Sequence, residues 1–322
     1  MCCGDDGEPH FHELEPNRWV AQALGRPATE SLSEDWAAWL TYATVREAGR
    51  LGQGPFPTEA SIRYSGRMPR FPIEEWMAGQ LRLTAFVSAR IAANIEQLWE
   101  SVTGAVPDES SSNPKKGTSE ASGAYGPGKL LLRLQPDRLD WLINPEDIDP
   151  ESPPVDPFRS LGPWHEGVAA LDTLAATWLA RQDLPPIERM AFGSVLLHRE
   201  DTKEAGYERL GDYIPVRPPA DASDFLYQIN HPVMSGTGIA NLRINRLSKW
   251  SNGVFRAVGF SLALGRATVT PLEQTAAYAM RLELDVNTAP DFPGPIPADR
   301  LVDVYRELVD LGRVIAAEGP RP

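Results

Sequence analysis

The feature that most constrains the fold of this chain is a strict alternation in AYAMRLELDVN, residues 277–287. Apolar Met280, Leu282, Leu284 and Val286 alternate with charged Arg281, Glu283 and Asp285. Successive side chains of a β-strand point to opposite faces, so this pattern predicts a strand with one buried and one polar face.

Other segments give the same signal. LLLRLQPDRLDWLINP (130–145) predicts strand, tight turn at Gln135–Arg138, and strand. Further strands are expected in IERMAFGSVLLHRE (187–200), DFLYQINHP (224–232) and VFRAVGFSLAL (254–264), and a strand or helix in IANLRINRLSKW (239–250). Helices are expected at 165–181 and, capped by Asp201, at 201–214. Strands joined by short turns, with helices gathered around them, predict an α+β fold with antiparallel sheet.

Two longer helices complete this expectation. Pro72 is suited to begin a helix, and the spacing of apolar residues from Trp76 to Val102 predicts one long helix over 73–102, ended by Gly104. The segment 297–317, between Pro297 and Gly319, predicts a C-terminal helix.

Composition divides the chain into four expected regions. Residues 1–16 contain acids and no Lys or Arg, which predicts an acidic tail. A mainly helical region follows over 17–104. The Ser-, Gly- and Pro-rich stretch 105–129 predicts a flexible linker, and 130–322 an α+β region.

Charge and cysteine content exclude several classes of protein. The formal net charge of −13 opposes general nucleic-acid binding, because a polyanion is repelled at long range. Two adjacent cysteines cannot form a disulfide framework. The chain also lacks a secretory signal pattern and any apolar run of about 20 residues, so we expect a cytoplasmic protein without membrane attachment. The abundance of Ala, Arg, Gly and Pro is typical of a high-GC bacterial gene.

The N-terminal stretch MCCGDDGEPHFHELEP brings together four metal-ligand side chains, Cys2, Cys3, His10 and His12. Thiolate and imidazole are ligands for zinc or another transition metal. Adjacent cysteines, however, cannot easily direct both sulfurs at one tetrahedral ion. The alternatives are therefore a metal site and an acidic tail without a specific ligand.

A local excess of positive charge occurs between Thr237 and Thr268, where no Asp or Glu is present. Its centre, NLRINRLSKW, offers Arg243, Arg246, Lys249 and Trp250 as a basic patch for an acidic protein partner or a phosphate. The alternative is internal pairing of these cations with the acids of PEDIDPESPPVDP (145–157).

Familiar catalytic motifs do not meet their structural requirements. GAYGPGKL (Gly123–Leu130) has the spacing of a phosphate-binding loop, but a strand instead of a helix is expected after it and Leu130 takes the hydroxyl position. His165, His198 and His231 have acidic neighbours but no dense ligand spacing, and Ser194 lacks a nucleophile elbow. We assign no catalytic triad.

At LLLRLQPDRLDW, DFLYQINHP and AYAMRLELDVN the chain resembles a sporadically distributed family of uncharacterised bacterial α+β proteins, over residues 60–317. The acid-tipped strand typical of that family corresponds here to Leu282–Asp285. The resemblance implies an accessory gene, of the kind carried on mobile islands in defence or conflict systems, and implies no activity or catalytic residues.

The sequence thus favours a non-enzymatic binding or accessory protein of a bacterial cytoplasm, which engages an acidic partner or phosphate ligand through the basic patch. The alternative is a metal-binding protein or metal-dependent enzyme that uses the N-terminal Cys/His cluster, with an acid such as Asp285 nearby.

Overall fold

The fold is seen in a computed structural model that describes residues 72–88, 94–146, 157–219, 221–255 and 276–320, and the backbone of 258–263 and 266–271. These residues belong to a compact unit, Gly66–Pro322.

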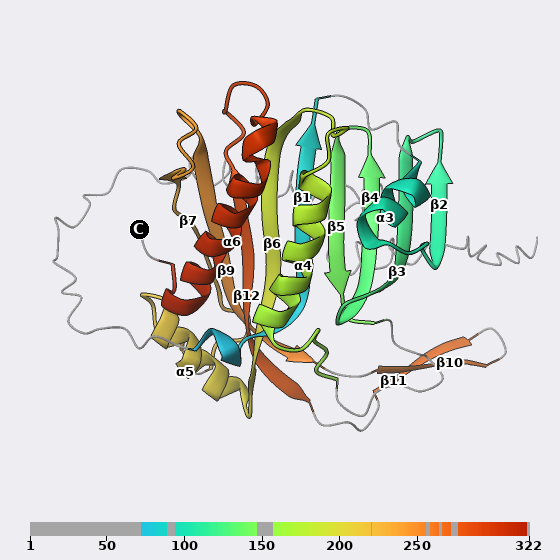
Figure 1. Cartoon of the computed structure of the whole chain (residues 1–322). Helices are drawn as coiled ribbons and strands as arrows, with labels where there is room; N and C mark the ends of the chain where they lie inside the picture. The colour runs from blue at the N-terminus through green and yellow to red at the C-terminus, as the bar shows by residue number, and fades with distance from the viewer. Residues whose placement is uncertain are drawn as a thin grey trace, which may run out of the picture. The chain divides into compact units, whose positions relative to one another are not determined.

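A ten-stranded antiparallel sheet forms the body of the unit (Figure 1). Its order is β2-β3-β4-β5-β1-β6-β12-β9-β7, with β8 also paired to β9. The strands are β1 (Met77–Val87), β2 (Glu109–Asn113), β3 (Thr118–Tyr125), β4 (Gly128–Gln135), β5 (Arg138–Asn144), β6 (Ile187–Glu200), β7 (Leu226–Asn230), β8 (Val233–Met234), β9 (Arg243–Phe255) and β12 (Ala277–Thr288). A separate hairpin, β10 (Val258–Ala263) and β11 (Arg266–Pro271), lies between β9 and β12 in the chain.

Four helices pack on one face of this sheet. They are α3 (Ile95–Thr103), α4 (Trp164–Leu179), α5 (Lys203–Tyr213) and α6 (Leu301–Glu318), and two 3-10 turns, η1 (Ile73–Glu75) and η2 (Ala298–Arg300), accompany them. Figure 1 shows α3, α4 and α6 lying across the same side of the sheet. The predicted α+β class and C-terminal helix are confirmed, although the fold is dominated by its sheet.

Close helix–sheet contacts show which residues lie under the helices. A Cβ at Gly167 of α4 would stand 2.8 Å from Leu81 Cδ1, and one at Gly312 of α6 would stand 3.0 Å from Phe192 Cε1. The core contains six fully buried tryptophans, of which Trp141 and Trp250 lie on strands of the sheet. Burial of these large side chains supplies much of the free energy that stabilises the sheet.

The opposite face, on which no described helix packs, is called the open face below. The register places on it Gln80, Arg82, Thr84 and Phe86 of β1 and Arg189, Ala191, Gly193 and Val195 of β6, with the residues that pair beside them. Its side chains are mostly polar or charged and half-buried. Antiparallel sheets commonly show this division into a core face and a polar face.

The two halves of the unit repeat one order of elements. Each begins with a strand followed by a helix (β1–α3 and β6–α5) and ends with a strand followed by a helix (β5–α4 and β12–α6). Each first strand pairs with the last strand of its own half, and β1 pairs with β6 at the junction. The centre of the open face is therefore built by both halves.

The prediction of one long helix over 73–102 is wrong. Among the described residues of that range, η1 and α3 are the helical segments, and Met77–Val87 forms β1 between β5 and β6. The buried residues of β1 recur at a spacing of two, as in a strand: Leu81, Leu83, Ala85 and Val87. Some of the same residues also fit the helical spacing on which the prediction was based. Pairing with β5 on one side and β6 on the other provides backbone hydrogen bonds for β1, and this tertiary gain overrides helical propensity.

The prediction of a flexible linker over 105–129 is also wrong. The segment forms β2 and β3, with every residue of β2 exposed at the edge of the sheet. Exposed edge strands such as β2 tolerate polar residues. The neighbouring strand β3 packs on α3. GAYGPGKL forms the β3–β4 hairpin, in which Gly126 turns the chain with φ of 54°.

At the N-terminus of α5 the capping residue is Thr202 and not the predicted Asp201.

Candidate functional site

The structure separates the four residues predicted to form a basic patch. All lie on β9, where successive residues point to opposite faces. The register with β12 places Arg243 and Lys249 on the open face, whereas Arg246 and Trp250 lie under the helices. The four residues therefore do not form one binding surface.

Each of the four residues has partners within the protein. Trp250 is fully buried, with its ring centroid 5.1 Å from that of Tyr213, and Arg246 Nε donates to the His231 carbonyl over 2.9 Å. Arg243 pairs with Asp291, and Lys249 Nζ lies 3.0 Å from Glu283 Oε1. Internal pairing of the cations thus occurs. The acids that pair with Arg243 and Lys249 are Asp291 and Glu283, which lie outside residues 145–157.

The centre of the open face carries a different group of cations, drawn from strands in both halves. Arg82 lies on β1, Arg138 on β5 and Arg189 on β6. Around them lie Lys129, Arg133, Arg199, Arg243, Lys249 and Arg281, against the carboxylates of Glu109, Glu120, Asp140, Glu283 and Asp285. The open face is therefore more cationic than anionic, in a chain whose net charge is −13.

Arg138 is neutralised locally. Its Nε lies 2.7 Å from Asp140 Oδ2 and its Nη2 donates to Asp140 Oδ1 over 2.9 Å. Thr84 Oγ1 donates to the same Oδ1 over 2.5 Å. Asp140 is almost fully buried, and a buried carboxylate needs a cation and hydrogen-bond donors. Arg138 balances its charge, and Arg138 and Thr84 donate hydrogen bonds to it.

Arg189 is held by an aromatic ring. Its guanidinium carbon lies 4.8 Å from the centroid of Phe86, which sits between Arg189 and Arg138 in the register. Burial lowers the pKa of Arg189, and the negative charge of Asp285 opposes that shift. A cation over an aromatic face is stabilised by the ring quadrupole.

Arg82 is the least satisfied of the three. Its guanidinium lies directly over the backbone of Gly193, where a Cβ would stand 3.0 Å from Arg82 Nε and 3.1 Å from Nη2. Nε is buried and has no hydrogen-bond partner. The nearest carboxylate oxygen, Asp285 Oδ2, is 3.9 Å from Nη2, and Arg82 and Asp285 keep 25% and 26% of their side chains exposed.

The row of residues across the sheet explains this arrangement. Leu142, Arg82, Gly193, Asp285 and Leu247 are direct neighbours on β5, β1, β6, β12 and β9. A side chain at the middle position would press on the Arg82 guanidinium, so glycine suits its present placement. Asp285 is held by Asn287, whose Nδ2 donates to Asp285 Oδ1 over 2.9 Å.

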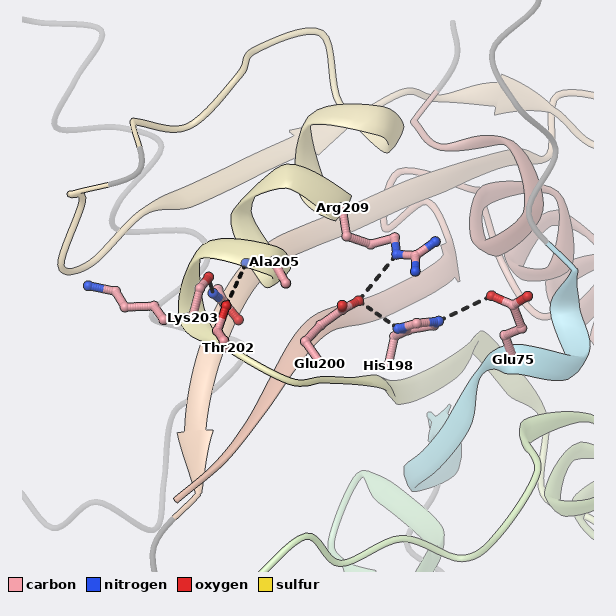
Figure 2. A network of polar contacts seen from close by, with 8 residues as sticks. Glu75, His198, Glu200, Thr202, Lys203, Ala205 and Arg209 are labelled. Carbon is pink, nitrogen blue, oxygen red and sulfur yellow. Dashed lines mark hydrogen bonds and ion pairs between the residues drawn. The ribbon is translucent and has the colours of Figure 1, made fainter. Parts of the chain in front are cut away.

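A second polar network lies at one end of β6, on the helix-covered side (Figure 2). His198 Nδ1 is 2.7 Å from Glu200 Oε1, and His198 Nε2 is 3.2 Å from Glu75 Oε2. Arg209 of α5 donates from Nε to the same oxygen of Glu200 over 3.2 Å. The network joins η1, β6 and α5.

Both ring nitrogens of His198 are thus engaged, so in this arrangement neither is available to a substrate. Trp76 packs edge-on against the imidazole, with ring centroids 6.0 Å apart, and donates from Nε1 to the Ala316 carbonyl over 3.1 Å. Among the described residues, no three His, Cys, Asp or Glu side chains are grouped as metal ligands. These contacts describe a clamp that fixes η1 to the core.

We expect His198→Ala to lower the free energy of unfolding by about 1–3 kcal/mol, because Glu200, 8% exposed, would keep only part of its hydrogen bonding. Urea unfolding at neutral pH measures this loss. His165→Ala is the matched control, because the His165 side chain is half exposed. Equal unfolding midpoints for the two variants would contradict the clamp.

The predicted metal ligands Cys2, Cys3, His10 and His12 lie outside the described residues, and the metal site stays a prediction. Of the described histidines, His165 lies in α4, His198 in β6 and His231 between β7 and β8. Ser194 accepts from Trp164 Nε1 over 3.0 Å and donates to the Gln80 carbonyl over 3.2 Å, which makes it a buried structural hydroxyl.

No protein-family model matches the chain, and a search of curated proteins finds no match. In the described part of the chain, none of the helices has the length and apolar character needed to cross a membrane.

The sequence does not reveal Arg82, Arg138 and Arg189 as a group. Its patterns place Arg82 in an expected helix and Arg138 in an expected turn. The polar side of 277–287, with Arg281, Glu283 and Asp285, was the available signal: it predicts a charged sheet face, on which neighbouring strands must also place charged residues.

Proposed function

We propose that this protein is a non-enzymatic binding protein that engages an acidic partner through the open face of its sheet. The oxyanions that such a face would take are carboxylates or phosphates. The observation that carries the proposal is Arg82, whose buried Nε has no hydrogen-bond partner and whose Nη2 is 3.9 Å from Asp285 Oδ2.

An arginine that is three-quarters buried normally has its N–H groups paired, because an unpaired buried charge is costly. A ligand carboxylate or phosphate would supply those bonds in bidentate geometry. The surrounding surface suits a protein segment, since half-buried Leu131, Leu142, Val195 and Leu247 lie between the cations. Arginine is enriched in protein–protein interfaces, although other charged residues are depleted from their cores.

The test is binding of a fluorescently labelled oligoglutamate peptide to the full-length protein, followed by anisotropy. We expect saturable binding that weakens as salt is raised through about 0.15 M, where the Debye length is ~8 Å. A labelled oligolysine of equal length should bind to the acidic parts of the surface outside the open face. Absence of saturable oligoglutamate binding at low salt would refute the proposal.

A further inference from the structure

We infer that Arg82 and Gly193 form an oxyanion subsite and that Asp285 is its internal competitor, which an incoming carboxylate or phosphate displaces. This inference rests on the proposed function and specifies where on the open face the ligand's charge is bound. It also predicts an unusual result, a gain of binding when an acidic residue is removed.

The first support is the flat floor of the subsite. Gly193 and, two residues earlier, Ala191 are the open-face residues of β6 beside Arg82 and Thr84. Gly193 is buried and Ala191 is 5% exposed, so neither projects above the sheet. The guanidinium of Arg82 occupies the space beside Gly193 that a Cβ would approach to 3.0–3.3 Å.

The second support is the incomplete neutralisation of Arg82. Its separation of 3.9 Å from Asp285 is at the limit of an ion pair and is too long for a hydrogen bond. Asp285 instead accepts a hydrogen bond from Asn287, and its charge also acts on Arg189. One carboxylate therefore serves two guanidinium groups and is in direct hydrogen-bonding contact with neither of them among the contacts described.

The third support is a comparison with Arg138, on the same face. Arg138 has two contacts to Asp140 of 2.7 and 2.9 Å, and Asp140 is nearly inaccessible. The Nε of each arginine is buried without a well-aligned hydrogen bond, so the difference between them is the distance to a carboxylate. Arg138 lies directly against Asp140, whereas the Arg82 guanidinium is 3.9 Å from a partly exposed carboxylate and is the one that a ligand oxyanion would complete.

A ligand oxyanion bound to the Arg82 guanidinium would lie near Asp285, and the two like charges would repel each other. Asp285 must then turn away or lose its influence for the ligand to bind. Removing its charge while keeping its shape, as in Asp285→Asn, should therefore raise the affinity. At ~4–6 Å in partly solvated surroundings, one unit charge corresponds to about a five- to tenfold change.

The experiment compares oligoglutamate affinity among full-length variants. Asp285→Asn should bind about fivefold tighter than the unsubstituted protein. Gly193→Ala should bind about tenfold more weakly, because its Cβ would displace the Arg82 guanidinium. In an Arg82→Gln background the gain from Asp285→Asn should vanish, since the two substitutions act on one contact.

Two matched controls should change affinity by less than about twofold. Asp303→Asn makes the same change of charge on α6, on the helix-covered side. Gly253→Ala adds the same methyl group to a strand position of β9, where the nearest heavy atom would be 3.7 Å away. Circular dichroism and thermal melts of every variant establish that each is folded.

The outcomes separate the two proposals. If the unsubstituted protein binds and the Asp285 and Gly193 variants match it, the subsite is wrong and the binding face stands. If neither the unsubstituted protein nor Asp285→Asn binds, both proposals fail. Competition by acetate and by inorganic phosphate at equal ionic strength then identifies the source of the oxyanion: stronger displacement by phosphate assigns a phosphate group, and equal or weaker displacement assigns a carboxylate.

Discussion

Arg82→Glu is expected to lower the affinity for oligoglutamate by about a hundredfold or more. The substitution removes the guanidinium that the ligand would contact. It also places a second carboxylate near Asp285, whose Oδ2 is 3.9 Å from Arg82 Nη2 in the unsubstituted protein. Loss of one partner of a desolvated charge pair costs about 2–5 kcal/mol, and about 2.7 kcal/mol corresponds to a hundredfold change. Anisotropy titration against the labelled peptide measures the effect.

Arg306→Glu on α6 is the control for this substitution. It makes the same change in net charge on a helix that covers the other face of the sheet. We expect its affinity to stay within about threefold of the unsubstituted protein, because surface charges more than a Debye length from the ligand are largely screened. An equal loss in both variants would show that total charge, and not the open face, governs binding.

Trp250→Ala is expected to lower the free energy of unfolding by about 3–5 kcal/mol, as is typical for truncation of a buried tryptophan. Trp250 is fully buried, lies 6.3 Å from Trp76 between ring centroids, and donates from Nε1 to Ser248 Oγ over 3.1 Å. The truncation would leave a large cavity under α5. Urea unfolding measures the change, followed by far-UV circular dichroism of the backbone in place of tryptophan fluorescence.

Arg243→Ala, on the same strand, is the matched comparison. Its side chain is half exposed and its pair with Asp291 lies at the surface, so a loss below about 1 kcal/mol is expected. If Trp250 belonged to a surface patch together with Arg243, the two substitutions would have similarly small effects. That result would contradict the structure of β9.

The sequence predicted those strands whose alternation is uninterrupted. AYAMRLELDVN forms β12, and LLLRLQPDRLDWLIN forms β4 and β5 with the expected turn. In these strands one face is apolar and the other charged, so the period of two can be read directly. The C-terminal helix was predicted for a similar reason: its apolar residues recur at the helical period between clear boundaries.

The central strand could not be recognised in the same way. In β1, Thr84 and Phe86 lie on the polar side while Ala78 and Ala85 lie in the core, which weakens the contrast between its faces. Helical spacing from Trp76 through Leu83 to α3 then fitted the segment equally well. Its identity as a strand depends on β5 and β6, which are distant in sequence.

The candidate site depends on the same long-range pairing. Arg82, Gly193 and Asp285 are far apart in the chain and become neighbours only when β1, β6 and β12 are in register. A basic patch was instead sought within one short segment, NLRINRLSKW. Because that segment is a strand, its alternating residues are divided between the two faces of the sheet.

Photo-crosslinking tests the central claim most directly, since it locates the ligand on the protein. An oligoglutamate peptide with a photoreactive group would be irradiated with the full-length protein, and the modified residues identified by mass spectrometry. We predict crosslinks to the open face near Arg82 and Gly193, on β1, β5, β6 and β12, and their loss in Arg82→Glu. Crosslinks concentrated on α4 or α6, and unchanged by Arg82→Glu, would contradict a binding function of the open face.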